Sequence, residues 1–191
     1  MKTSKRLIAM LLALVTLFGL VGCTGAKGEF TDGTITENSY ENAFLGIGCK
    51  LNDDWYTDIE ESEQELVSDE GIITDFLAAT DDATQHISVI VQDMGLVYGA
   101  VMDEKSLIES ALAGVEQGIS EMDGEKVSIK IAEVDFCGAT RYAYDCSYER
   151  SGMPVFQKQI YLKKGKYLAV ITFSTYLENT TDDMVKLFYA I

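Results

Sequence analysis

The chain has 191 residues, with 31 acidic against 15 basic side chains and a formal net charge of −16. Its composition, 47% hydrophobic and 24% charged, is that of a folded domain rather than a disordered chain. The negative charge argues against DNA or RNA as a partner, because binding a phosphate backbone requires clustered Lys and Arg. His86 is the single histidine, which excludes zinc sites that need two imidazoles.

The first 22 residues predict an export signal. Lys2, Lys5 and Arg6 precede an uncharged, mostly apolar run of 15 residues from Leu7 to Val21. A bilayer-spanning helix needs about 20 residues, so this run better fits the core of a signal peptide. A single transmembrane anchor is the alternative interpretation.

The residues Leu20-Val21-Gly22-Cys23 resemble the lipobox of bacterial lipoproteins. In that family the peptide is cut before the cysteine, whose sulfur carries a diacylglyceryl group. The resemblance implies that Cys23 is the lipidated first residue of a mature protein, held on the extracytoplasmic face of the cell membrane by its acyl chains. Cleavage removes three bases and no acid, so the mature chain is more acidic still.

The mature chain divides into a linker and one domain. Residues 23–39 mix Gly, Thr and acids without apolar periodicity, which predicts a flexible linker. Residues 40–191 predict a single domain. Its first part contains two short strands, at 40–42 and 45–51, and then Trp55, which we expect to close one end of the core.

The middle of the chain predicts a hairpin and two helices. A short helix fits Ile59 to Ser68, and antiparallel strands fit Ile72 to Thr80 and His86 to Met94. A longer helix from Glu104 to Met122 has Asp103 as its expected cap, and Gly124 suits its exit. Its buried stripe comprises Ile108, Ala111, Leu112, Val115, Ile119 and Met122.

The last part predicts a meander of four strands and a terminal helix. The strands are Val127 to Phe136, Thr140 to Arg150, Val155 to Lys163 and Tyr167 to Tyr176. The helix begins at Thr180, and its apolar positions are Met184, Val185, Phe188 and Ile191. The fold class is therefore α+β, an antiparallel meander sheet with helices packed on it.

This order of elements resembles the PsbP/Mog1-like α-β-α sandwich. The resemblance rests on the opening from Tyr40-Glu41-Asn42 to Trp55, the long middle helix, the tyrosine-rich meander and the closing helix. The proline usual before the tryptophan is missing. Members of that fold bind a photosystem or a small GTPase, and neither role fits an exported lipoprotein, so only the fold is implied.

The residues give weak signals for catalysis or metal binding. The sequence contains no Gly-x-Ser-x-Gly motif that would place a nucleophilic serine for a catalytic histidine. We therefore interpret His86 as a structural residue. The segment Asp53 to Glu70 contains nine acids and no base but lacks a calcium-loop pattern, which favours a solvated face. We expect no cofactor, no metal ion and no enzymatic activity. A hydrolase built on scattered carboxylates is the alternative.

Three cysteines remain after Cys23. Export permits a disulfide, but a turn at Gly138-Ala139 would place Cys146 opposite Ile131, too far from Cys137 for a bond. Buried free thiols are the main expectation, and pairing of Cys49 with either Cys137 or Cys146 stays open.

The most apolar loop lies between the hairpin and the long helix. The segment Met94 to Met102 has no polar residue and is flanked by Asp93 and Asp103. The simplest interpretation of this segment is a buried connection. An apolar loop bordered by charge is also typical of a contact surface. We therefore expect Leu96, Val97 and Tyr98 to contact an envelope protein or another ligand, and interpret the whole as a lipid-anchored, non-catalytic binding protein.

Overall fold

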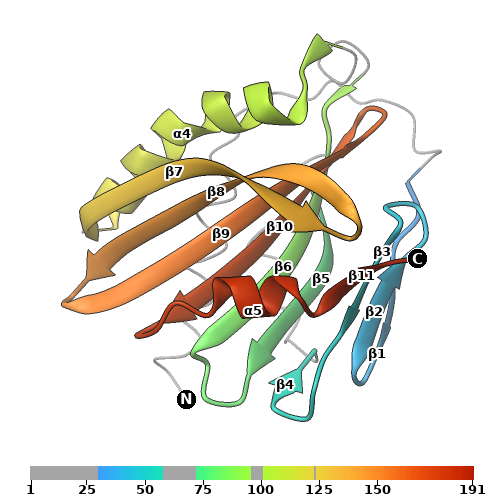
Figure 1. Ribbon diagram of the computed structural model, residues 1–191, viewed down its shortest axis with the longest axis horizontal. Coiled ribbons are helices and arrows are strands. Elements are labelled where there is room, and N and C mark those ends of the chain that lie inside the picture. The colour runs from blue at the N-terminus through green and yellow to red at the C-terminus, as the bar shows by residue number, and fades with distance from the viewer. Residues whose placement is uncertain (1–29, 58–71, 96–100, 123) are drawn as a thin grey trace.

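The computed structural model describes residues 30–57, 72–95, 101–122 and 124–191. These residues form two antiparallel sheets and two helices (Figure 1), which makes the fold α+β and dominated by its sheets. The strands are β1 Thr34–Thr36, β2 Ser39–Asn42, β3 Ile47–Lys50, β4 Trp55–Tyr56, β5 Ile72–Thr80, β6 Gln85–Asp93, β7 Gly124–Phe136, β8 Ala139–Arg150, β9 Met153–Lys164, β10 Tyr167–Tyr176 and β11 Phe188–Ala190, and the helices are α4 Glu104–Glu121 and α5 Thr181–Val185.

The larger sheet has seven strands in the order β4-β5-β6-β10-β9-β8-β7. Strand β10 lies in its middle, pairs with β6 and β9, and is buried along its whole length. A central strand covered on both faces needs side chains that tolerate burial, which its sequence YLAVITFSTY largely provides. The hairpin of β5 and β6 and the four-strand meander therefore confirm the sequence prediction.

Helix α4 covers one face of this sheet. The Asp103 carboxylate accepts a hydrogen bond from the backbone N–H of Ser106 (2.7 Å) and caps the helix as predicted. Ile108 and Ile119 belong to one buried cluster with Tyr144 of β8. The Glu104 carboxylate also accepts a hydrogen bond from Arg141 (2.8 Å), which fixes the start of α4 over the sheet.

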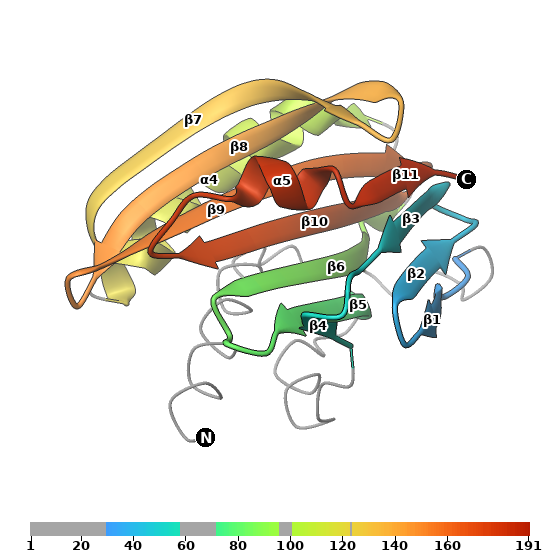
Figure 2. The ribbon, with the colours of Figure 1, turned by 60° about the horizontal axis from the view of Figure 1, so that its bottom comes forward.

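The smaller sheet and α5 cover the opposite face. This sheet has the order β1-β2-β3-β11, and Figure 2 shows β11 and α5 in front of the larger sheet with α4 behind it. Met184 of α5 and Phe188 of β11 share a buried cluster with Phe173 of β10, whose ring centre lies 5.5 Å from that of Phe188. Trp55 joins the same cluster and is 8% exposed, which confirms its expected place in the core.

A bulge in β5 brings a carboxylate into the interior. The pairing of β5 with β6 shifts between Thr74 and Phe76, so Asp75 is the additional residue. Because of this shift, the side chains of Asp75 and Phe76 both reach Tyr40: its hydroxyl donates to the Asp75 carboxylate, and its ring stacks on Phe76 at 4.5 Å. Asn42 (2.7 Å) and the backbone N–H of Gly33 (2.7 Å) also donate to Asp75.

The predicted terminal helix is wrong beyond Val185. The helix α5 spans five residues, and the chain then extends into β11, where Phe188 pairs with Cys49 of β3. The spacing of Met184, Val185 and Phe188 fits a helix, but the unpaired edge of β3 supplies backbone partners that a local pattern does not reveal. Ile191, expected on the buried side, is 52% exposed.

Two further boundaries differ from the prediction. Part of the expected linker, residues 30–39, belongs to the fold, since Phe30 packs 5.4 Å from Phe44 and β1 pairs with β2. The turn between β7 and β8 lies at Cys137 and Gly138, both with positive φ (51° and 76°), one residue earlier than expected. Cys146 consequently lies opposite Ile129 rather than Ile131.

Candidate functional site

Three segments far apart in the sequence meet around a cleft of about 510 Å³ at one end of the larger sheet. They are the turn that leads into β4, the turn between β5 and β6, and the region from Thr180 to Leu187 that contains α5. We call this hollow the acidic cleft. Its lining comprises Asn52, Asp54, Trp55, Thr80, Asp81, Asp82, Gln85, Thr180, Asp183, Met184 and Leu187.

Backbone pairing holds these segments together. Trp55 pairs with Thr80 across β4 and β5, and the backbone N–H of Asp81 donates to the carbonyl of Asp54 (3.1 Å). The backbone N–H of Tyr176 donates to the carbonyl of Thr84 (3.0 Å), so the end of β10 meets the same turn. The chain then runs from β10 into α5, which places that helix beside the cleft.

The turn between β5 and β6 is ordered by one carboxylate. Asp82 accepts hydrogen bonds from the Thr80 hydroxyl (2.7 Å), the Thr84 hydroxyl (2.8 Å) and the Thr84 backbone N–H (3.0 Å). These bonds, above all that from Thr80, lower the pKa of Asp82 because they favour its charged form. Asp82 is therefore anionic at neutral pH.

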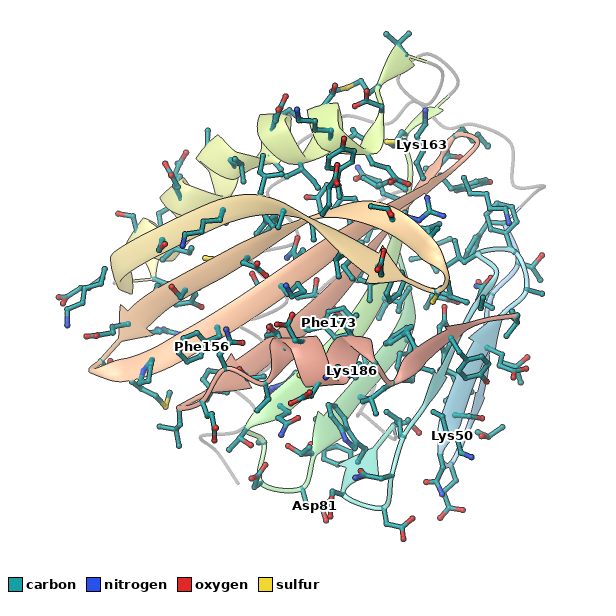
Figure 3. All side chains as sticks on the ribbon, in the orientation of Figure 1. Lys50, Asp81, Phe156, Lys163, Phe173 and Lys186 are labelled. Atoms are coloured by element: carbon teal, nitrogen blue, oxygen red, sulfur yellow. The ribbon has the colours of Figure 1, made fainter. Side chains whose placement is uncertain are left out.

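The cleft has an acidic rim and an apolar floor. Asp54, Asp81, Asp82 and Asp183 line it, and no Lys or Arg is among its lining residues. Asp183 forms an exposed ion pair with Lys186 (2.7 Å). Figure 3 labels Asp81 at the β5–β6 turn and Lys186 just after α5.

The floor consists of buried side chains. Trp55 and Met184 are 8% and 2% exposed, and Leu187 is partly buried. The Thr180 hydroxyl also lines the cleft, and although its oxygen is buried, no group among the described residues hydrogen-bonds it. The cleft therefore combines negative charge, apolar surface and the Thr180 hydroxyl.

A carboxyl general acid needs a raised pKa, whereas the pKa of Asp82 is lowered, so Asp82 does not fit that role. Among residues 30–57, 72–95, 101–122 and 124–191, no three His, Cys, Asp or Glu side chains are grouped closely enough to hold a metal ion.

A second hollow, of about 260 Å³, contains the buried cation Lys158. The Lys158 ammonium group forms ion pairs with Asp145 and with Asp182 (3.2 Å). Because its charge is already compensated within the fold, this hollow is a weaker candidate than the acidic cleft.

The structure describes only some of the residues that the sequence singles out. Cys23, Leu96, Val97 and Tyr98 lie outside the described residues, as do the 59–68 helix and most of the acidic segment from Asp53 to Glu70. His86 is buried on the larger sheet, and its ring packs 5.9 Å from that of Tyr176.

The cysteines after Cys23 are free thiols. Cys49 and Cys146 are buried and Cys137 is half-buried. Burial raises the pKa of Cys49 and Cys146 to about 12 and that of Cys137 to about 11, so all three are protonated at neutral pH. The main expectation of unpaired thiols is confirmed.

Sequence reasoning missed the acidic cleft. Its signal is the presence of two acidic turns, Asn52-Asp53-Asp54 and Asp81-Asp82, but only the pairing of β4 with β5 shows that they adjoin. Helix α5 also lines the cleft, and hydrophobic periodicity does not predict where so short a helix lies relative to the sheet.

No protein-family model matches the chain, and no curated protein matches its sequence. Solved structures resemble it distantly. A Bacteroides thetaiotaomicron protein aligns with 13% identity and a TM-score of 0.43 over 76% of this chain, which spans 45% of that protein. LpqN of Mycobacterium tuberculosis, described as involved in cell envelope biogenesis, aligns with 14% identity and a TM-score of 0.43 over 75% of this chain and 82% of its own.

A Pseudomonas aeruginosa protein of unknown function aligns with 14% identity and a TM-score of 0.31, over 67% of this chain and 76% of its own. On the described part of the chain, neither helix has the length and apolar character needed to cross a membrane.

Proposed function

We propose that this protein is a lipid-anchored lipoprotein of the cell envelope whose PsbP/Mog1-like domain binds a ligand without catalysis. The anchor is supported by the basic start, the short apolar run and the lipobox-like Leu20-Val21-Gly22-Cys23. The net negative charge of the chain keeps the domain off anionic headgroups.

The ligand is a small organic polycation in the acidic cleft. The observation that carries this proposal is the convergence of four aspartates over a floor of Trp55 and Met184, with no basic lining residue. A volume of about 510 Å³ is within the usual range for small-molecule sites. An aliphatic polyamine fits this lining because its ammonium groups are separated by apolar methylene segments.

Each part of the cleft has a role in this complex. The aspartates around the rim pair with ammonium groups, and methylene segments pack against the floor. The Thr180 hydroxyl, which no described residue hydrogen-bonds, offers an uncharged acceptor for one ammonium N–H. Trp55 adds an aromatic ring, which attracts cations at close range.

The test is titration calorimetry of the full-length chain in phospholipid nanodiscs, with spermidine as the probe. Asp54→Asn with Asp81→Asn removes two rim charges and spares Asp82, which orders the turn. Each lost ion pair weakens binding by about 0.5–1 kcal/mol, so the double variant should bind roughly tenfold more weakly.

The matched control is Glu133→Gln with Asp135→Asn. Both are exposed residues of β7, which lies at the opposite edge of the larger sheet from β4. This control makes the same change in net charge and should bind spermidine nearly as the unaltered protein does. Equal weakening in both double variants would show a nonspecific charge effect, and absence of spermidine binding would refute the proposal.

A further inference from the structure

The hollow around Lys158 is lined by side chains of both charges. Its volume is about 260 Å³, and its lining includes Lys130 of β7, Asp145 of β8, Lys158 of β9 and Asp182 of α5. None of its lining residues is among those of the acidic cleft. We call it the mixed-charge hollow.

The strand register places three of these charges in a row across the larger sheet. Lys130 pairs with Asp145, and Asp145 pairs with Lys158, so side chains of alternating sign stand on adjacent strands of one face. Lys158 also pairs with Phe173, whose ring packs against Phe188 of β11, so this is the face that α5 and the smaller sheet cover. Neighbouring strands are about 4.8 Å apart, so one small molecule can contact a positive and a negative group together.

One of the cations is buried. Lys158 is 6% exposed, and its ammonium group forms ion pairs with Oδ1 of Asp145 and with Oδ1 of Asp182 (3.2 Å). Burial opposes the charge of Lys158, but the two carboxylates outweigh this effect and raise its pKa, so the group is cationic at neutral pH. An ammonium group has three N–H donors, and the two ion pairs leave one for a ligand.

The other three charged groups are open to solvent. The side chains of Asp145 and Asp182 are 45% and 82% exposed, so both carboxylates still offer oxygen lone pairs to a ligand. Lys130 is exposed, and within the part of the chain that the structure describes no carboxylate forms an ion pair with it. A ligand therefore reaches these groups without any movement of the chain.

Hydrogen bonds fix the side of the hollow that α5 provides. Asn179 accepts hydrogen bonds from the Thr181 hydroxyl (2.8 Å) and the Thr181 backbone N–H (3.2 Å), and Thr181 is buried. Asp182 follows directly in the chain, so its position over the sheet is set before a ligand arrives. Phe156 of β9, which Figure 3 labels near α5, is half-buried and adds apolar surface to the same hollow.

The balance of charge indicates the kind of ligand. Two cations and two anions line the hollow, so it attracts a simple ion less than the acidic cleft does and suits a molecule that carries both charges. In an α-amino acid the ammonium group, the carboxylate and the side chain are all attached to one carbon atom. The hollow is smaller than the usual site for a drug-sized ligand, which is about 300–1,000 Å³, and this suits a molecule of that size.

We propose that the mixed-charge hollow binds a free α-amino acid with an apolar side chain. The carboxylate of the ligand accepts hydrogen bonds from Lys130 and Lys158, and its ammonium group pairs with Asp182. The apolar side chain packs against Phe156. This site goes beyond the polyamine binding proposed above and does not depend on it, because the two hollows have no lining residue in common.

The test is titration calorimetry of the full-length chain in phospholipid nanodiscs. The probes are L-leucine and L-phenylalanine, together with the N-acetyl derivative of each, which has no ammonium group, and the amide of each, which has no carboxylate. At least one free amino acid should bind at millimolar concentration, and both of its derivatives should bind at least tenfold more weakly. Absence of binding by both amino acids, or a derivative that binds as tightly as its parent, would overturn the proposal.

A substitution of Lys130 tests the assignment to this hollow. Lys130→Gln removes a cation that no described carboxylate pairs with, so it should leave the thermal midpoint unchanged and weaken amino-acid binding about two- to fivefold. Lys130→Arg keeps the charge and should restore most of the affinity. Unchanged affinity in Lys130→Gln would contradict the assignment.

The matched control is Lys50→Gln, at the exposed end of β3 in the smaller sheet. Figure 3 shows Lys50 and Phe156 on opposite sides of the view. This control makes the same change in net charge and should leave amino-acid affinity unchanged, so equal weakening in Lys50→Gln and Lys130→Gln would refute a specific site. Asp54→Asn with Asp81→Asn should also leave it unchanged, so failure of the acidic cleft and failure of the mixed-charge hollow give different results.

Discussion

Tyr40 of the smaller sheet donates a hydrogen bond to the carboxylate of Asp75, a buried residue at the bulge of the larger sheet. Burial and the adjacent carboxylate both raise the pKa of Tyr40, so its hydroxyl keeps its proton and remains a donor. Asn42 and the backbone of Gly33 complete the set of donors to Asp75. This contact joins the two sheets through the interior.

Tyr40→Phe should therefore destabilise the fold. The change leaves the ring in place and removes one donor from a buried carboxylate, at an expected cost of about 2 kcal/mol in the free energy of unfolding. Urea denaturation measures the difference. Tyr189→Phe is the control, because its hydroxyl donates to Glu41 at the exposed surface (2.7 Å) and its loss should cost under about 0.5 kcal/mol. Equal losses in the free energy of unfolding would show that the buried hydrogen bond of Tyr40 to Asp75 stabilises the fold no more than the exposed one of Tyr189.

Stability should fall as the pH is lowered from 7 to 5. The pKa of His86 is about 4 in the fold against 6.5 for an ordinary histidine, so the unfolded chain binds a proton in this range and the folded chain does not. This difference lowers the free energy of unfolding by about 2 kcal/mol at pH 5, and the loss levels off below pH 4. Urea midpoints at pH 7 and pH 5 give the measurement.

His86→Gln should remove most of this dependence, since His86 is the only histidine. A variant that loses as much stability between pH 7 and pH 5 as the unaltered chain would assign the effect to other groups.

Trp55→Ala should cost about 3 to 5 kcal/mol in the free energy of unfolding, because it removes a large ring from the buried cluster between the sheets. Trp55→Phe keeps an aromatic ring at the position and should cost less. A urea midpoint for Trp55→Ala that equals that of the unaltered protein would refute the assignment of Trp55 to the core.

Cys23→Ala should abolish incorporation of labelled fatty acid and leave the signal segment uncleaved. The reason is that the thioether to diacylglycerol requires the Cys23 sulfur. Cys137→Ala, which removes a thiol within the fold, should remain labelled and membrane-bound. Recovery of labelled Cys23→Ala protein from membranes would contradict lipid anchoring.

The fold was predictable where a hydrophobic pattern extends over a long helix or over several consecutive strands. The α4 stripe with Ile108 and Ile119 repeats at helical spacing, and the meander strands alternate around short turns, so their types follow from local sequence. The strand β11 was not predictable, because its three residues pair only with β3, about 140 positions away in the chain. Likewise, the bulge at Asp75 depends on its contacts with Tyr40 and Asn42.

The candidate sites were less predictable than the fold. Gln157 and Gln159 are buried in β9, where a polar residue is unexpected, and nothing in the local sequence predicts their burial. The acidic cleft arises from three separated segments and has no contiguous motif.

The binding of a cationic ligand by the acidic cleft is the central claim, and Trp55 offers a direct test of it. Trp55 is the only tryptophan and lines this cleft, so its fluorescence reports on occupancy there. Titration with spermidine at low ionic strength should produce a saturable change in emission, which added salt reverses and Asp54→Asn with Asp81→Asn weakens about tenfold. Emission that stays constant throughout the titration, or that changes equally in this double variant, would contradict the account.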